Sequence, residues 1–137
     1  MIRILLFTLF FCILNNACDT SGSCSVYLAS DKQQSCNIVV TDNINKSSRW
    51  VSARLKFKGI DLTTGKEVLY KSKTRDWSPL YIYINIGDTV VKNEGEAIMY
   101  VYKKDSIVIR NLSNMCNTDF DWKKDVYTFI LRDSISE

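Results

Sequence analysis

The side chains best suited to chemistry are two carboxylates, Asp119 and Asp121, which lie on either side of Phe120 and directly precede Trp122. Carboxylate oxygens bind cations, and an acid pair beside an aromatic ring can also hold a sugar. Acidic residues in a loop are far more often simply hydrated, and we favour this interpretation. The pair is therefore kept as a candidate for binding, not for catalysis.

Catalytic chemistry is not indicated elsewhere in the chain. Hydrolytic enzymes usually recruit histidine or paired buried carboxylates, whereas this sequence has no histidine and four glutamates. Glu94 and Glu96 flank Gly95 in a predicted turn, and a cysteine nucleophile would lack an imidazole partner. The sequence has no glycine-rich phosphate loop and no C-x-x-C pair. We predict a protein that is not an enzyme and that has neither a metal site nor a cofactor.

Five cysteines are spread over the chain. Cys12 lies in an apolar N-terminal segment and Cys18 at its end, which leaves Cys24, Cys36 and Cys116. In an exported protein any two of these three can form a disulfide, so three pairings are open. We prefer Cys36–Cys116, because it would tie the first clear strand to the last quarter of the chain and add about 4 kcal/mol of stability. If the thiol of Cys18 is also available for pairing, four cysteines remain and two disulfides become feasible.

The chain is also rich in aromatic residues, with three tryptophans and seven tyrosines. Trp77, Tyr81 and Tyr83 are candidates for an exposed platform that binds a sugar ring or a protein. The favoured alternative is that large rings fill the core and pair across strands. Residues 80–86 alternate and are expected to form a strand, with a short helix after Pro79 as the open alternative.

The first residues have the form of an export signal. Arg3 precedes an uncharged apolar run at residues 4–14. This run is too short to span a bilayer as a mature helix. We therefore predict a signal peptide over residues 1–17, a short polar tether over residues 18–24 and a single β domain over residues 25–137.

The end of this signal, Ala17-Cys18, resembles the cleavage site of bacterial lipoproteins. The usual pattern has leucine three residues before the cysteine, where this chain has Asn15, and relaxed sites of this kind are familiar in lipoproteins of Bacteroidota. The resemblance implies that Cys18 becomes the new N-terminus and carries fatty acyl chains such as palmitate, which insert into the membrane. The protein would then lie in the bacterial cell envelope, at the outer membrane or the periplasmic face. The alternative is an ordinary secreted protein cut near Ala17.

Three triplets resemble the O-glycosylation acceptor of Bacteroidota, in which aspartate is followed by serine or threonine and then by a residue with a methyl group. They are Asp88-Thr89-Val90, Asp105-Ser106-Ile107 and Asp133-Ser134-Ile135. The resemblance implies glycosylation at Thr89, Ser106 or Ser134, whereas the alternative is ordinary turn chemistry between strands. The segment from Trp77 to Tyr102 also resembles small Bacteroidota lipoproteins, but this resemblance brings no known activity.

The dominant pattern of the chain is alternation with a period of two, which is typical of strands that bury one face. Leu55 and Phe57, for example, fall on one side of a strand and lysines on the other. Strands are expected at residues 36–41, 51–58, 67–71, 96–102, 106–110 and 126–132, with a weaker one at 25–29. Residues 61–66 form a predicted hairpin turn, and residues 111–124 form an irregular segment. About six to eight strands predict an all-β fold, a small antiparallel sandwich or barrel.

Charge excludes one class of partner. Without residues 1–17 the chain has 17 basic and 15 acidic residues, a net charge of +2, and no basic run exceeds two residues. This balance does not indicate nucleic-acid binding. We predict a lipid-anchored binding or structural module of the cell envelope with a protein partner. The alternatives are a glycan-binding module that uses exposed aromatics and an inhibitor or immunity-type envelope protein. A broad apolar patch without a groove would favour the protein partner.

Overall fold

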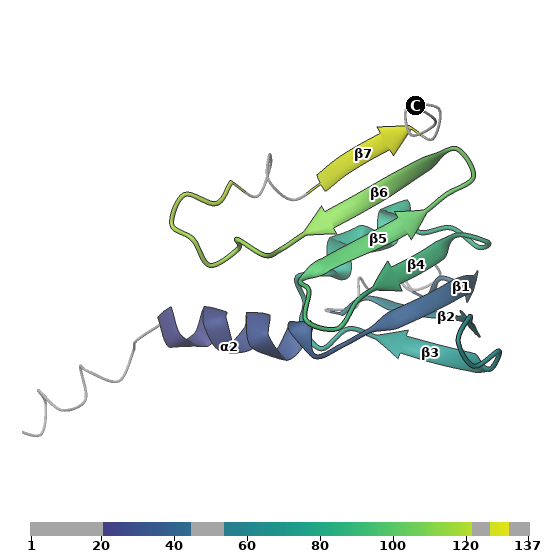
Figure 1. Cartoon of the computed structure of the whole chain (residues 1–137), viewed down its shortest axis with the longest axis horizontal. Coiled ribbons are helices and arrows are strands. Elements are labelled where there is room, and N and C mark those ends of the chain that lie inside the picture. The colour runs from purple at the N-terminus through teal and green to yellow at the C-terminus, as the bar shows by residue number, and fades with distance from the viewer. Residues whose placement is uncertain (1–20, 45–53, 122–126, 132–137) are drawn as a thin grey trace, which may run out of the picture.

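Seven strands form one antiparallel sheet in the order β3-β2-β1-β4-β5-β6-β7 in a computed structural model (Figure 1), which describes residues 21–44, 54–121 and 127–131. The strands are β1 (Cys36–Asp42), β2 (Lys56–Asp61), β3 (Glu67–Lys71), β4 (Thr89–Lys92), β5 (Ile98–Tyr102), β6 (Ser106–Asn111) and β7 (Tyr127–Leu131). The prediction of an all-β antiparallel fold of about six to eight strands is confirmed. All the described strands belong to this one sheet.

The sheet has one buried and one more open face, because successive side chains of a strand point to opposite sides. On the buried face, which we call the inner face, Phe57, Val90 and Met99 have no exposed surface. On the opposite outer face, Val91 of β4 pairs with Tyr100 of β5, and both are partly exposed. The alternation recognised in the sequence therefore separates the two faces of the sheet.

The hairpin between β2 and β3 forms where the sequence predicts it. Asp61 accepts hydrogen bonds at Oδ1 from the backbone N–H groups of Thr63 and Thr64, at 2.9 and 2.8 Å. Gly65 closes the turn with φ +69°, a backbone conformation that glycine adopts without a steric penalty. The predicted turn at residues 61–66 is confirmed.

A 3₁₀ helix, η1 (Ser78–Tyr83), occupies most of the stretch 80–86. The expectation of a strand there is wrong, and the helical alternative is correct. Pro79 fixes its own φ near the helical value and lacks an N–H group, so it suits the first turn of a helix. Leu80 and Ile84 are fully buried and belong to the core on the inner face, which explains why apolar residues recur in this stretch without forming a strand.

The helix α2 (Ser21–Lys32) precedes the sheet and extends away from it (Figure 1). The weaker strand expected at residues 25–29 is wrong, since these residues lie within α2. Val26 and Tyr27 are 67% and 58% exposed, whereas Leu28 packs against the core. A helix forms its backbone hydrogen bonds within itself, so a segment that lies outside the sheet needs no neighbouring strand. Residues 21–24, the end of the predicted tether, belong to the same helix.

Candidate functional site

A hollow of about 770 Å³ lies at the end of β6, beside the turns that follow this strand. Its wall is formed by Asn111, Asn114, Asn117, Thr118, Asp119 and Phe120. Cys116 and Thr128, the latter from β7, are the other described residues of the lining. We call this hollow the asparagine pocket.

The turns that build the asparagine pocket are held by backbone hydrogen bonds and by one buried side chain. Leu112 is fully buried, and its N–H group donates to the carbonyl oxygen of Ala97 at 2.8 Å. The N–H group of Asn117 donates to the carbonyl oxygen of Asn114 at 2.9 Å, and that of Phe120 to the carbonyl oxygen of Asn117 at 3.2 Å. These local bonds place asparagine side chains at successive turns of the wall.

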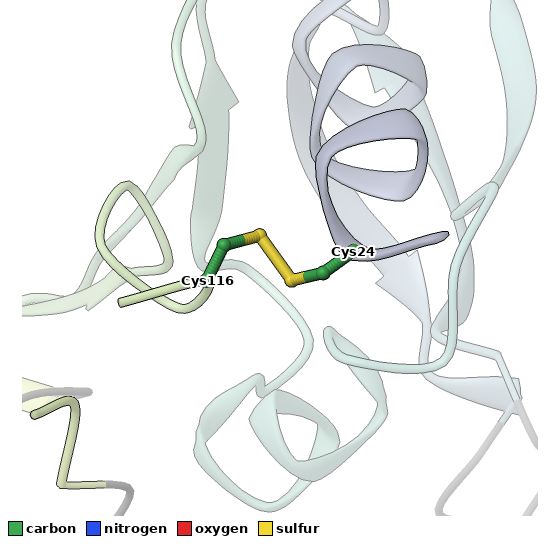
Figure 2. The surroundings of a disulfide bond; sticks show 2 residues. All are labelled: Cys24 and Cys116. Atoms are coloured by element: carbon green, nitrogen blue, oxygen red, sulfur yellow. A yellow bond between two sulfur atoms is a disulfide. The ribbon is translucent and has the colours of Figure 1, made fainter. Parts of the chain in front are cut away.

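A disulfide between Cys24 of α2 and Cys116 also fixes the pocket wall (Figure 2). The two Cα atoms are 5.8 Å apart, and the residues are separated by 92 positions in the sequence. The preferred pairing of Cys36 with Cys116 is wrong. Cys36 lies on the inner face in β1, 8% exposed, whereas Cys116 is exposed in the turns beyond the end of the sheet. Cys36 is the free cysteine of the described residues.

The described residues that line the asparagine pocket are mostly polar, and none of them is basic. Asn114 and Asn117 are exposed, and their side-chain amides make no hydrogen bond within the described ranges. The carboxylate of Asp119 accepts a hydrogen bond from the hydroxyl of Thr118 at 3.4 Å. Phe120 is half-buried and packs against the core. The pocket thus offers amide donors and acceptors, a carboxylate and the side of one aromatic ring.

Sequence reasoning found part of this pocket. Asp119 of the predicted acid pair and its aromatic neighbour Phe120 line the pocket. Asp121 is half-buried and is not among the described lining residues. Trp122 lies outside the described residues. The three asparagines were missed, although their regular spacing of three positions, at 111, 114 and 117, is a signal that the sequence contains.

The second notable feature is β7, which lies at one edge of the sheet. Its five residues carry no charge, and the side chains of Phe129 and Leu131 are 58% and 68% exposed. Tyr83 of η1 contacts Phe129, with ring centroids 5.4 Å apart, and the adjacent Ile82 is also exposed. We call Phe129, Leu131 and Tyr83 the β7 patch.

The β7 patch is supported from beneath by a buried cation. The guanidinium of Arg110 lies 4.9 Å from the ring centroid of Tyr127, which in turn packs against Tyr83 at 5.0 Å. Arg110 also donates a hydrogen bond to the carbonyl oxygen of Asp76. Burial lowers the pKa of Arg110 and raises that of Tyr127. The cation–π contact fixes the aromatic cluster at the junction of η1 and β7.

The three candidate binding aromatics have different positions. Trp77 has no exposed surface, so the prediction that it belongs to an exposed platform is wrong, and the core alternative holds for it. Tyr81 is half-buried, and its carbonyl oxygen accepts a hydrogen bond from the side chain of Asn43 at 3.0 Å. Tyr83 belongs to the β7 patch. A coplanar pair of Tyr81 and Tyr83 on one strand face does not form, because η1 is helical.

Buried polar side chains join the end of α2 to the sheet. The ammonium group of Lys92, in a residue 1% exposed, donates to the carbonyl oxygens of Gln34 and Glu96 at 2.7 and 2.8 Å. Asp31 accepts a hydrogen bond from the hydroxyl of Thr74 at 2.7 Å. Burial raises the pKa of Asp31 and lowers that of Lys92, and it raises the pKa of the Cys36 thiol to about 12. The sequence did not indicate this cluster, which has a structural role.

The predicted modification sites are only partly within the described residues. Thr89 begins β4 and Ser106 begins β6, and both are half-buried. The carboxylate of Asp88 pairs with Lys103 and accepts the N–H group of Asn85, so this aspartate has a turn role, as the alternative interpretation expects. Cys18 and Ser134 lie outside the described residues.

Within the described ranges, no helix has the length and hydrophobicity needed to cross a membrane, and no three acidic, cysteine or histidine side chains cluster as metal ligands. Comparisons with protein-family models, with curated proteins and with solved structures give no match to this chain. The chain's own surfaces offer two candidate sites, the asparagine pocket and the β7 patch.

Proposed function

We propose that this protein is an exported, lipid-anchored binding module of the bacterial cell envelope, attached through Cys18, that engages a protein partner along β7 without catalysis. The observation that supports a protein partner is the uncharged edge strand β7 with its two exposed apolar side chains, Phe129 and Leu131. The export signal over residues 1–17 and the sequence Ala17-Cys18 support the anchor.

The disulfide supports export and gives the anchor a defined attachment. Disulfides persist in oxidising compartments outside the cytosol, so the Cys24–Cys116 bond agrees with an envelope location. The helix α2 begins at Ser21, three residues after Cys18. Acyl chains on Cys18 would therefore hold α2 close to the lipid surface, and the disulfide would transmit this constraint to the sheet.

The two edges of the sheet differ in a way that favours a partner at β7. The strand β3 at the other edge has exposed charges at both ends, Glu67 and Lys71, and charged edge strands resist pairing with another chain. The strand β7 has no charge and exposes Phe129 and Leu131. An edge strand without charged side chains is a template on which a strand of another chain can pair.

The exposed residues of β7 indicate which kind of partner segment would pair with it. An extended segment of another protein would hydrogen-bond to the backbone of β7 and extend the sheet. Its side chains that point to the inner side would lie against Phe129, Leu131 and Tyr83, so apolar residues at alternate positions are expected there. Exposed apolar side chains at a strand edge, such as Phe129 and Leu131, suit a protein surface better than a polar small ligand.

Site-specific photo-crosslinking in the native envelope tests this proposal. A photoreactive residue at Leu131 of the full-length anchored protein is expected to give one discrete adduct. The matched control is Leu69 on β3, which is 58% exposed but lies on the charged edge, and which is expected to give none. Equal crosslinking at both positions, or none at Leu131, contradicts a partner at β7.

A charge variant shows whether an adduct depends on the β7 patch. Phe129→Lys should abolish crosslinking at Leu131, because a lysine head group in the contact would have to lose its hydration. Leu69→Lys should leave the adduct unchanged. An adduct with twice the mass of the chain would identify a second copy and would contradict a different protein as the partner.

A further inference from the structure

We infer that the asparagine pocket binds a neutral pyranose sugar of an envelope glycan. This site is separate from the β7 patch: Thr128 lines the pocket, whereas Phe129, the next residue of the same strand, points to the opposite face of the sheet. The inference adds a ligand to the binding module and does not depend on the protein partner.

The donors and acceptors of the pocket match vicinal hydroxyl groups. A carboxamide presents an oxygen acceptor and two N–H donors side by side, and Asn114 and Asn117 present such groups at exposed positions without another hydrogen bond in the described ranges. The Asp119 carboxylate accepts hydrogen bonds, and each of its oxygens has more than one acceptor site. One sugar hydroxyl can therefore donate to Asp119 while its neighbour bonds to an amide.

Phe120 supplies the apolar surface that a pyranose needs. One face of a sugar ring carries C–H groups, which pack on an aromatic side chain while the hydroxyls at the rim form hydrogen bonds. Phe120 lies between Asp119 and Asp121 in the sequence, lines the pocket and packs against the core. Its ring is therefore fixed beside the polar groups that would bind the hydroxyls.

The lining disfavours other classes of small ligand. Asp119 is the charged side chain among the described residues that line the pocket, and its carboxylate would repel a phosphate or a sulfate. An apolar ligand would bury the amides of Asn114 and Asn117 without partners, at a cost in free energy. A volume of about 770 Å³ is sufficient for a ring of hexose size and part of a second ring.

The disulfide has a role in this site. Cys116 lies in the wall between Asn114 and Asn117, and its bond to Cys24 restrains this turn from outside the loop (Figure 2). A restrained turn presents its amides in one arrangement and loses less conformational entropy when a ligand binds. Sugar binding should therefore weaken when the disulfide is reduced.

The experiment is a calorimetric titration of the mature, acylated protein in a detergent that contains no sugar, since many detergents carry a glycosidic head group. The probes are glucose, galactose, mannose and N-acetylglucosamine, with inorganic phosphate as the anionic control. At least one sugar is expected to bind with a dissociation constant on the order of 1 mM. Binding of phosphate, or of no sugar at about 20 mM, overturns the inference.

Variants assign the binding to the pocket. Asn117→Ala and Asn114→Ala, both at exposed positions, should each weaken sugar binding by roughly three- to tenfold, the loss expected for one or two hydrogen bonds. Asn85→Ala, the same chemical change in the exposed turn at the opposite end of the sheet, should have no effect. Equal affinities for Asn117→Ala and the unmodified protein place any sugar elsewhere and refute the site.

The outcome is independent of the proposed partner. Loss of sugar binding in Asn117→Ala should leave photo-crosslinking at Leu131 unchanged, and Phe129→Lys should leave the sugar affinity unchanged. A protein that binds a sugar but gives no adduct at β7 would retain this inference and contradict the partner. The reverse result would contradict the sugar site alone.

Discussion

Loss of the Cys24–Cys116 disulfide should reduce the stability of the fold substantially. The bond closes a loop of 92 positions that contains β1 to β6. In the chain-entropy model, a closed loop of this length lowers the entropy of the unfolded state by an amount equivalent to about 4.6 kcal/mol at 25 °C. This is a large part of the free energy of unfolding of a typical domain, about 5–15 kcal/mol.

The test is urea denaturation of the double variant Cys24→Ser/Cys116→Ser beside the unmodified protein. Cys24 is half-buried and Cys116 exposed, so the serine side chains themselves should cost little. With an m-value of about 1.5 kcal/mol/M, the midpoint should fall by about 3 M urea. Cys36→Ala, which removes a buried thiol but leaves the bond intact, is the control and should cost about 1 kcal/mol.

Two results would refute the reasoning. If the double variant loses less than about 1 kcal/mol, the bond does not constrain the unfolded chain as the loop length requires. If Cys36→Ala destabilises the protein as much as the double variant does, Cys36 takes part in the cross-link. Peptide mapping without reduction distinguishes these cases, because it should recover a peptide pair joined through Cys24 and Cys116 and a free Cys36.

Three further predictions concern the core. Cys36, buried and with its pKa raised to about 12, should resist iodoacetamide in the native protein and react in denaturant, and labelling at the native state would contradict its burial. Burial raises the pKa of Asp31 above 3.8, so the folded state binds the carboxyl proton of Asp31 more tightly than the unfolded state does. Ionisation of Asp31 therefore lowers the free energy of unfolding as the pH rises above 3.8. The stability of Asp31→Asn relative to the unmodified protein should accordingly improve between pH 3.8 and neutral pH, which denaturation at two pH values measures, and a constant difference would argue against it. Gly59→Ala should cost more than about 2 kcal/mol or prevent folding, since its Cβ would overlap the carbonyl oxygen of Val39; a thermal midpoint near that of the unmodified protein would show that the two strands separate easily.

The hairpin from β2 to β3 could be predicted because its signals are local. Alternation at Leu55 and Phe57 defines the inner face, and Asp61 and Gly65 provide the turn chemistry. The stretch after Pro79 shows the limit of this approach. Apolar residues at alternate positions there also fit a short 3₁₀ helix, and packing against the inner face, not the pattern, decides between them.

Features that depend on the path of the chain could not be predicted. The disulfide pairing requires the first turn of α2 to be near the turns after β6, and no local signal in the sequence determines this. Burial of Lys92 likewise depends on carbonyl oxygens of Gln34 and Glu96, which come from two different turns. The asparagine pocket was recognised only in part, because Asp119 and Phe120 have familiar chemistry and asparagines in turns usually do not indicate a ligand.

The central claim, attachment to a membrane through Cys18, is tested most directly by the intact mass of the protein extracted from its native envelope. We predict a chain that begins at Cys18, carries the added mass of acyl chains and contains one disulfide, with partition into the detergent phase. A water-soluble protein without acyl chains, or one that begins at any other residue, would contradict the anchor and the envelope function built on it.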